Sequence, residues 1–192
     1  AMELLENRIR EDAEVLPGNI LKVSNFLNHQ IDVKLMDQMG EEFARLYKDT
    51  PVTKILTIES SGIAVAYSVA QKFGVPLVFA KKHKSSNVNE DVYSAKVWSF
   101  THNQEYTVVV SKKYISSCDK ILLVDDFLAN GAALNGLIKI VGDAGAKVQG
   151  ICIAIEKGFQ NGGKELREKG FRVESLAIVD KMTDDGKIQF RS

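Results

Sequence analysis

The order of apolar and polar residues predicts an α/β fold from about residue 53 onward. Short apolar runs typical of β-strands alternate there with stretches of helical periodicity, a rhythm typical of a parallel sheet flanked by helices. The predicted strands are residues 54–58, 76–80, 121–124, 148–155 and 172–178, and the predicted helices are 62–73, 134–144 and 161–169. The run at 121–124 is aliphatic throughout, which favours a central strand that is covered on both faces.

Two regions depart from this alternation. Residues 83–90 are polar and show no periodicity, and two β-rich stretches follow them at 92–101 and 106–111. This pattern predicts a mobile excursion with a hairpin, from about His83 to Thr107, that closes over a site as a lid. Residues 1–50 hold an amphipathic helix after a weakly periodic segment, and they predict a small lobe or hood.

The chain shows no internal repeat, low-complexity tract or linker. Its 192 residues suffice for one sizeable core, so we predict a single domain over residues 1–192, to which residues 1–50 contribute the hood. The 25 basic and 25 acidic residues leave no net charge to attract nucleic acid or an anionic membrane. Neither partner is therefore expected.

The amino terminus mixes charges into a helical pattern and lacks the order of a signal peptide, which predicts a cytoplasmic protein. No apolar run is long enough to predict a membrane span. Cys118 and Cys152 form no CxxC pair, and we expect neither a disulfide nor a zinc site. His29, His83 and His102 lack convincing metal or triad partners, and we interpret them as surface or packing residues.

The strongest chemical signal lies at residues 121–133. The apolar strand is followed by Asp125 and Asp126, at the carboxyl edge where open α/β sheets bind ligands. A loop of small residues then leads into a helix, whose first N–H groups favour an anion. A ribose 5-phosphate has both the hydroxyls that suit the acids and the phosphate that suits the loop. The loop residues are Ala129, Asn130, Gly131, Ala132 and Ala133.

A simpler interpretation makes the acid pair a solvated strand end with a helix cap. The combination of an aliphatic run, paired acids and a small-residue loop favours the ligand site instead. Neither GxxxxGK[ST] nor GxGxxG occurs, so the nucleotide P-loop and the dinucleotide fingerprint are absent.

Residues 121–133 resemble the phosphoribosyl pyrophosphate (PRPP) motif of the type I phosphoribosyltransferase family. Residues 125–131 are most similar to the bacterial branch that uses xanthine. Further blocks in matching order lie at 21–23, 26–30, 57–64, 79–82, 99–101 and 156–157. The resemblance implies an enzyme of purine salvage that transfers the phosphoribosyl group from PRPP to xanthine, releases pyrophosphate and forms a homodimer.

In that family, the positions that match residues 129–133 hold PRPP, and those that match Leu21, Asn28 and Lys157 contact xanthine. Taken alone, an asparagine such as Asn28 is usually a turn residue, and a strand-end lysine such as Lys157 is usually solvated. The chain departs from the family at two positions, with Val65 for a usual proline and Gly158 for a usual serine. The second lies beside Lys157, where it could loosen the base pocket.

Pyrophosphate is predicted to lie against Ser60, Ser61 and Gly62, which join a strand to a helix and include a glycine that permits close backbone approach. The simpler alternative is a plain N-cap serine. Lys82, one residue beyond the predicted second strand, is expected to neutralise the same group, although a solvated lysine is the commoner case. Mg²⁺ is expected near Asp125 and Asp126, often through water, with no direct ligand assigned.

Phe127 either stacks on the base or belongs to the core. Three other functions share part of the pattern. A guanine, hypoxanthine or adenine phosphoribosyltransferase would differ only in its base pocket. A ligand-sensing, DNA-binding regulator on the same fold is disfavoured by the neutral charge and the lack of an added DNA-binding domain. A HAD-type phosphatase needs DxDx[TV], but here Phe127 and Leu128 stand where that pattern requires Asp and a small β-branched residue.

Overall fold

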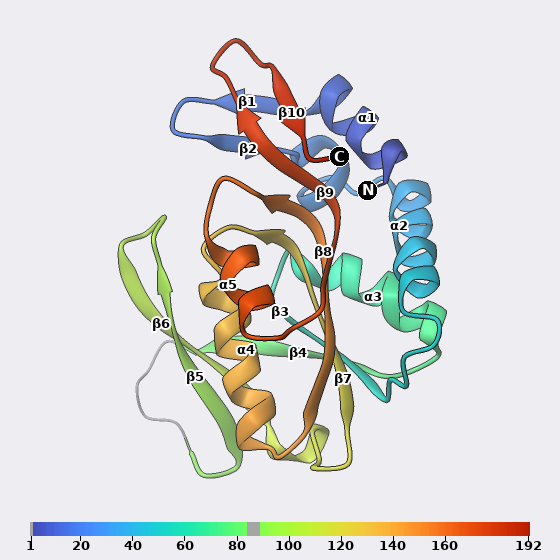
Figure 1. Ribbon diagram of the computed structural model, residues 1–192. Coiled ribbons are helices and arrows are strands. Elements are labelled where there is room, and N and C mark those ends of the chain that lie inside the picture. Colours follow the sequence, from blue (N-terminus) through green and yellow to red (C-terminus); the bar gives the residue numbers. More distant parts are fainter. Residues whose placement is uncertain (1, 84–88) are drawn as a thin grey trace.

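A computed structural model of the chain describes residues 2–83 and 89–192. Its centre is an eight-stranded sheet in the order β10-β9-β8-β7-β3-β4-β6-β5, and a two-stranded sheet, β1-β2, lies apart from it (Figure 1). The strands are β1 (Glu14–Leu16), β2 (Ile20–Lys22), β3 (Lys54–Ile58), β4 (Leu77–His83), β5 (Val92–Ser99), β6 (Gln104–Ser111), β7 (Lys120–Leu128), β8 (Lys147–Lys157), β9 (Val173–Met182) and β10 (Ile188–Phe190).

The helices are α1 (Glu3–Asp12), α2 (Val33–Leu46), α3 (Gly62–Phe73), α4 (Ala132–Asp143) and α5 (Gly162–Glu168), with a π-helical turn η1 (Ser24–Asn28) and a 3-10 turn η2 (Lys112–Tyr114). The five strands β4, β3, β7, β8 and β9 pair in parallel, whereas β10, β6 and β5 join antiparallel. The predicted α/β fold with a mainly parallel sheet is confirmed. Among the described helices, none is both long and apolar enough to cross a membrane.

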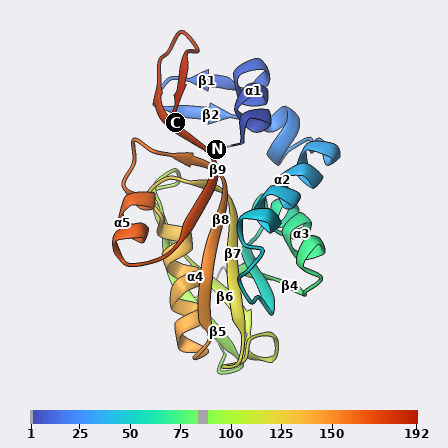
Figure 2. The same cartoon turned by 45° about the vertical axis from the view of Figure 1, so that its right-hand side comes forward.

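Strand β7 lies at the middle of the sheet because its side chains are apolar on both faces. Leu122 and Val124 pack into the core beneath α2 and α3, while Ile121 and Leu123 pack into the core beneath α4. Figure 2 shows these two helical layers on opposite sides of the sheet. Helices α3 and α4 both begin at the edge of the sheet where β7 ends.

Four strands extend further than the sequence predicted, and for β7 and β4 the difference concerns candidate site residues. Strand β7 continues to Leu128, because its parallel pairing to β8 runs on through Asp125 opposite Ile153. The two acids are therefore part of the strand and do not follow it. Strand β4 continues to His83, so Lys82 lies inside that strand, opposite Val108. In both strands the polar side chains suggested that the strand ends. Backbone pairing with the neighbouring strand continues past them.

The hood is built from both ends of the chain. Figure 1 shows α1, β1, β2 and β10 together above the carboxyl edge of the sheet, while α2 packs beside α3. Leu5 and Phe26 of the hood share one buried cluster with Val124 and Ala154 of the sheet. The hood and the sheet thus have a common core.

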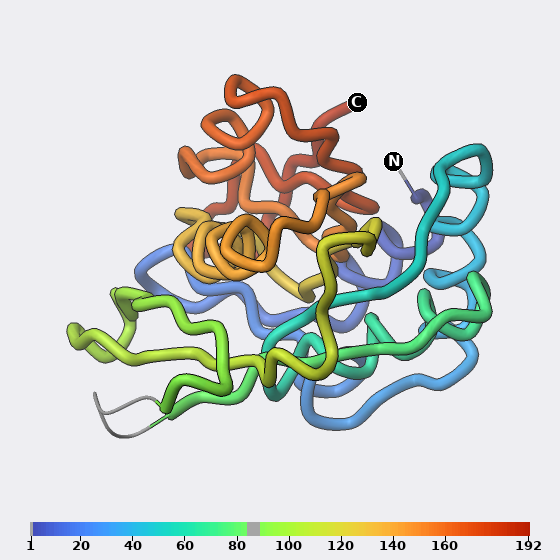
Figure 3. The backbone as a smooth tube through the Cα atoms, turned by 90° about the horizontal axis from the view of Figure 1, so that it is seen from below, coloured from blue at the N-terminus to red at the C-terminus, as the bar shows by residue number. Residues whose placement is uncertain are grey.

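The predicted hairpin is part of the sheet. Strand β6 pairs with β4, and β5 pairs with β6 at the sheet edge farthest from β10 (Figure 3). A Cβ added to Gly136 of α4 would lie 2.8 Å from Val97 of β5, so the helix and the hairpin are in close contact. Closure as a lid stays a prediction, and its residues 84–88 lie outside the described part of the chain.

Candidate active site

The acid pair on β7 is buried and has no ion-pair partner in the described part of the chain. Asp125 and Asp126 are 7% and 6% exposed, and no ion pair involves either one in residues 2–83 and 89–192. Asp125 Oδ1 accepts from the Asp126 N–H, and Asp126 Oδ1 accepts from the Phe127 N–H, at 2.9 Å each. Burial, followed by repulsion from Asp126, raises the pKa of Asp125 well above its ordinary value. Buried acids without a counter-charge are typical of functional sites.

The loop after β7 forms a small cradle. Gly131 has φ +85°, a left-handed conformation suited to glycine, and it occupies the N-cap position of α4. The Asn130 Oδ1 accepts from the Ala132 N–H at 2.9 Å, which fixes the turn. A cavity of about 140 Å³ lies against Asp125 and residues 127–134. It has room for about four water-sized groups and faces the first N–H groups of a helix, which suits a phosphate.

The start of α3 lies directly against the acid pair. A Cβ added to Gly62 would be 2.5 Å from Thr57 Oγ1 and 2.9 Å from Asp125 Oδ1, so a larger residue would have to displace these two side chains. Ser61 stands at the N-cap position but makes no side-chain cap, so the plain N-cap interpretation does not apply to it. The peptide bond between Glu59 and Ser60 is cis. The structure therefore brings the predicted pyrophosphate segment and the acid pair together.

Lys82 also lies near the acids. Its N–H donates to Glu59 Oε1 at 2.5 Å, and its Nζ lies 5.3 Å from the centroid of the Tyr106 ring. Burial, with a smaller contribution from Asp125, raises the pKa of Tyr106, and the positive charge of Lys82 partly offsets the effect of burial on Asp125. The charge of Lys82 thus acts on Asp125, although the two form no ion pair among the described residues.

Lys157 ends β8 beneath the hood. Its Nζ donates to the Asn19 carbonyl at 3.3 Å and lies 5.8 Å from the centroid of the Phe127 ring. The lysine is partly buried, and this burial lowers its pKa. Leu21, 5% exposed, follows Asn19 by two residues. The structure thus places Lys157 beside the hood segment that holds Leu21.

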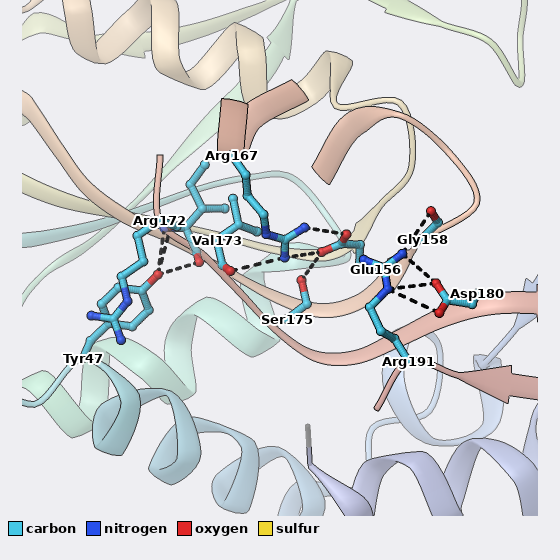
Figure 4. A network of polar contacts seen from close by, with 10 residues as sticks. Tyr47, Glu156, Gly158, Arg167, Arg172, Val173, Ser175, Asp180 and Arg191 are labelled. Atoms are coloured by element: carbon cyan, nitrogen blue, oxygen red, sulfur yellow. Dashed lines mark hydrogen bonds and ion pairs between the residues drawn. The ribbon is translucent and has the colours of Figure 1, made fainter. Parts of the chain in front are cut away.

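Asn28 and Gly158 have surroundings different from those of Lys157 and Leu21. Asn28 is exposed at the end of η1, and no hydrogen bond joins it to Lys157 among the described residues. At Gly158, an added Cβ would lie 2.6 Å from Asp180 Oδ1 and 2.7 Å from Arg191 Nη2. Figure 4 shows this ion pair, with Arg191 also donating to the Gly158 carbonyl. Asp180 and Arg191 fill the space left by the missing side chain, and a looser base pocket at Gly158 stays a prediction.

Sequence reasoning missed two residues of the site. Thr57 is fully buried, and its hydroxyl has no hydrogen-bond partner among the described residues. Its polarity within the apolar strand β3, just before the Ser60 segment, was a usable signal. Tyr106 gave none, because only the fold brings β6 alongside β4 and Lys82. A larger hollow of about 510 Å³ lies beside α5, but its arginines Arg167 and Arg191 are already used in ion pairs.

Comparison with known proteins decides the family. Residues 22–187 match the family described as Phosphoribosyl transferase domain. The chain belongs to this family. A xanthine phosphoribosyltransferase from Lachnoclostridium phytofermentans is 55% identical over 99% of this chain and 98% of that protein. One from Clostridium novyi is 56% identical over the full length of both.

Solved structures share the fold. The adenine phosphoribosyl transferase of Trypanosoma brucei, solved with AMP, pyrophosphate and ribose-5-phosphate, has a TM-score of 0.77 at 18% identity, over 95% of this chain and 82% of that one. The enzyme of Giardia lamblia, solved with 9-deazaadenine, has a TM-score of 0.73 at 26% identity, over 89% and 94%. This chain thus shares its fold with adenine enzymes, whereas the relatives above are named for xanthine.

Proposed function

We propose that this phosphoribosyltransferase joins xanthine to the ribose phosphate of PRPP, giving xanthosine 5-monophosphate and pyrophosphate. The observation that carries the proposal is the arrangement at the end of β7, where two buried acids that form no ion pair within the described residues adjoin a phosphate-sized cradle. Full-length relatives at 55% and 56% identity bear the name xanthine phosphoribosyltransferase, which supports the base.

The residues at this edge suit the three parts of PRPP. Backbone N–H groups of residues 129–133 hold the 5-phosphate, and Asp125 and Asp126 accept hydrogen bonds from the ribose hydroxyls. Ser60, Ser61 and Gly62 hold the pyrophosphate, with Lys82 beside them. The bond from the anomeric carbon to pyrophosphate breaks, a bond from that carbon to a ring nitrogen of the base forms, and the proton of that nitrogen passes to water or to the departing pyrophosphate. Charge that collects on the departing pyrophosphate is stabilised by Lys82 and the backbone.

The acid pair also suits Mg²⁺. Its oxygens are hard ligands of the kind that this ion prefers, and no cluster of three or more ligating side chains occurs in the described residues. Two carboxylates match an ion that retains water and substrate oxygens. When bound, Mg²⁺ would neutralise charge on the pyrophosphate of PRPP.

The base is proposed to lie between β8 and the hood. Lys157 and Phe127 face one another there, and Leu21 supplies an apolar side chain. We assign Asn28 to the 2-oxo edge of xanthine, because its amide can donate to an oxygen that guanine lacks. Lys157 is assigned to the 6-oxo and imidazole side, where an ammonium favours the more readily ionised base.

A base panel tests this function. Xanthine, guanine, hypoxanthine and adenine are each offered to the enzyme with PRPP and Mg²⁺, and product formation is followed by absorbance. We expect xanthine to be preferred, and Lys157→Ala and Asn28→Ala to erode that preference by about tenfold, since an unpaired buried group costs about 1–3 kcal/mol. Lys187→Ala, whose side chain is 84% exposed, is the matched control.

Three results would overturn parts of the proposal. Equal use of guanine, or full xanthine selectivity in Lys157→Ala, would leave a purine phosphoribosyltransferase of another or broader base choice. Binding of PRPP without turnover of any base would favour the ligand-sensing regulator.

We further propose a cytoplasmic homodimer of single-domain chains. Both cysteines are free thiols, as expected in a reducing compartment. The exposed apolar side chains of Val33 and Tyr67 border a groove of about 620 Å³ between α2 and α3, a surface suited to a second copy. Light scattering after gel filtration tests the dimer. A monomer at micromolar concentration would contradict it.

A further inference from the structure

The phosphate cradle rests on the first residue of α5. The Gly162 N–H donates to the Ala129 carbonyl at 3.0 Å. A Cβ added to Gly162 would lie 2.5 Å from the Ala129 oxygen, 2.7 Å from the Gly131 nitrogen and 2.8 Å from the Asn130 carbonyl carbon. All three are backbone atoms, which cannot rotate away as the end of a side chain can. Any residue but glycine at 162 must therefore displace the cradle or α5.

Helix α5 is not free to move instead. Arg167 donates from both Nη atoms to Glu156 at 2.8 Å each, and Ser175 Oγ donates to Glu156 at 2.6 Å (Figure 4). Glu156 is 2% exposed, and a Cβ added to Gly163 would lie 2.2 Å from its Oε2. The buried ion pair thus holds α5 against β8, so an added side chain at Gly162 would press on the cradle.

The ion pair of Glu156 and Arg167 connects the proposed base side of the site with its phosphate side. Glu156 directly precedes Lys157 on β8, and Gly162 contacts the back of the loop whose front faces the cavity beside Asp125. We propose that Gly162 is a positioning residue. Its contact with the backbone of the phosphate cradle fixes where the cradle lies and thereby determines the affinity for the phosphoribosyl donor. This inference rests on the proposed function of residues 129–133.

Donor kinetics of Gly162→Ala test the proposal. We expect the KM for PRPP to rise about tenfold or more, since ångström-scale misplacement of a binding group is costly, while the KM for xanthine changes less than about twofold. The matched control is Gly142→Ala, because a Cβ at Gly142 in α4 would meet nothing within 4 Å. Titration calorimetry with PRPP and Mg²⁺, without base, should show the same weakening.

A second variant covers the case in which Gly162→Ala does not fold. Arg167→Lys keeps the charge but loses the two-pronged contact with Glu156, so α5 loosens. It should raise the KM for PRPP about threefold, and more than the KM for xanthine. Equal KM values for PRPP in Gly162→Ala and Gly142→Ala, or an Arg167→Lys effect confined to xanthine, would overturn the inference. Failure of the wild-type enzyme to bind PRPP would instead overturn the proposed function.

Discussion

The two ends of strand β7 carry buried aspartates in opposite surroundings. Asp119, just before the strand, is 8% exposed and accepts from Lys54 Nζ at 3.1 Å, from Thr53 Oγ1 at 2.8 Å and from the Ser116 N–H at 2.8 Å. Asp125, near the other end, is as deeply buried but has no side-chain cation paired with it in the described residues. Asp119 thus has ionic and hydrogen-bond partners within the protein, whereas Asp125 has no ionic partner among the described residues.

The pKa directions follow from this difference. Burial alone would raise the pKa of Asp119, but the hydrogen bonds from Ser116, Thr53 and Lys54 outweigh it and leave that pKa below normal. For Asp125, burial and its acidic neighbour act in the same direction and raise the pKa. We interpret the amino end of β7 as part of the framework and the carboxyl end as a site whose missing partners are supplied by substrate. Each prediction below tests this division.

The largest effect is expected at the carboxyl end. Asp125→Asn combined with Asp126→Asn should lower kcat/KM by about 100-fold or more, because each lost charge-assisted hydrogen bond costs about 1.5–3 kcal/mol. The free energy of unfolding should stay equal or rise, since two adjacent buried carboxyl groups that form no ion pair among the described residues are replaced by neutral amides. Steady-state kinetics and urea unfolding measure both quantities. Wild-type turnover in this variant would refute the site.

The next effect is expected at the amino end. Asp119→Asn should lower the free energy of unfolding by about 1–3 kcal/mol and leave kcat/KM unchanged. Because the folded pKa of Asp119 is lowered, its stabilisation is present above the usual pKa of 3.8 and is lost as the pH falls through the folded value. The stability gap between variant and wild type should therefore close between pH 7 and acid. A gap independent of pH would remove the ionic explanation.

A smaller effect is expected at Gly158, which follows Lys157 and lies against Asp180 and Arg191. Gly158→Ser should displace the pair of Asp180 and Arg191, lower the free energy of unfolding by about 1 kcal/mol and raise the KM for xanthine. Arg191 is partly exposed and can move, which limits the cost. Thermal melts and base kinetics check it. An unchanged KM would show that this pair does not influence the neighbouring Lys157.

The smallest effect is expected at a purely surface pair. Arg45 and Glu42 are one turn apart on α2, and the arginine side chain is 66% exposed. Arg45→Ala should change the free energy of unfolding by less than about 0.5 kcal/mol and leave activity intact. A loss comparable to that of Asp119→Asn would mean that exposure does not separate the two classes of ion pair.

The sequence predicted the order of strands and helices well because periodicity is a local signal. Helix α3 and strand β3 begin and end where the pattern indicated. The ends of β4 and β7 were predicted too early, because the polarity of Lys82 and Asp125 suggested a strand end. Pairing with neighbouring strands, which no local pattern records, decides those ends.

The site was predictable where it is contiguous in the chain. Residues 125–133 combine acids, small residues and a glycine that adopts a positive φ, so one segment indicated a ligand site. Contacts between distant segments were not predictable in this way. Gly162 touches Ala129, and Lys157 touches Asn19 of the hood, only because the fold brings them together. The same is true of the Arg191 pair that fills the space at Gly158.

Thermal melting with and without PRPP and Mg²⁺ tests the central division most directly. A ligand that binds the folded state at 100 times its Kd stabilises it by about 2.7 kcal/mol. Wild type and Asp119→Asn should show the same upward shift in Tm, although the second starts lower. Asp125→Asn with Asp126→Asn should start no lower than wild type and show little shift. An equal shift in that double variant would contradict the assignment of the carboxyl end of β7 as the donor site.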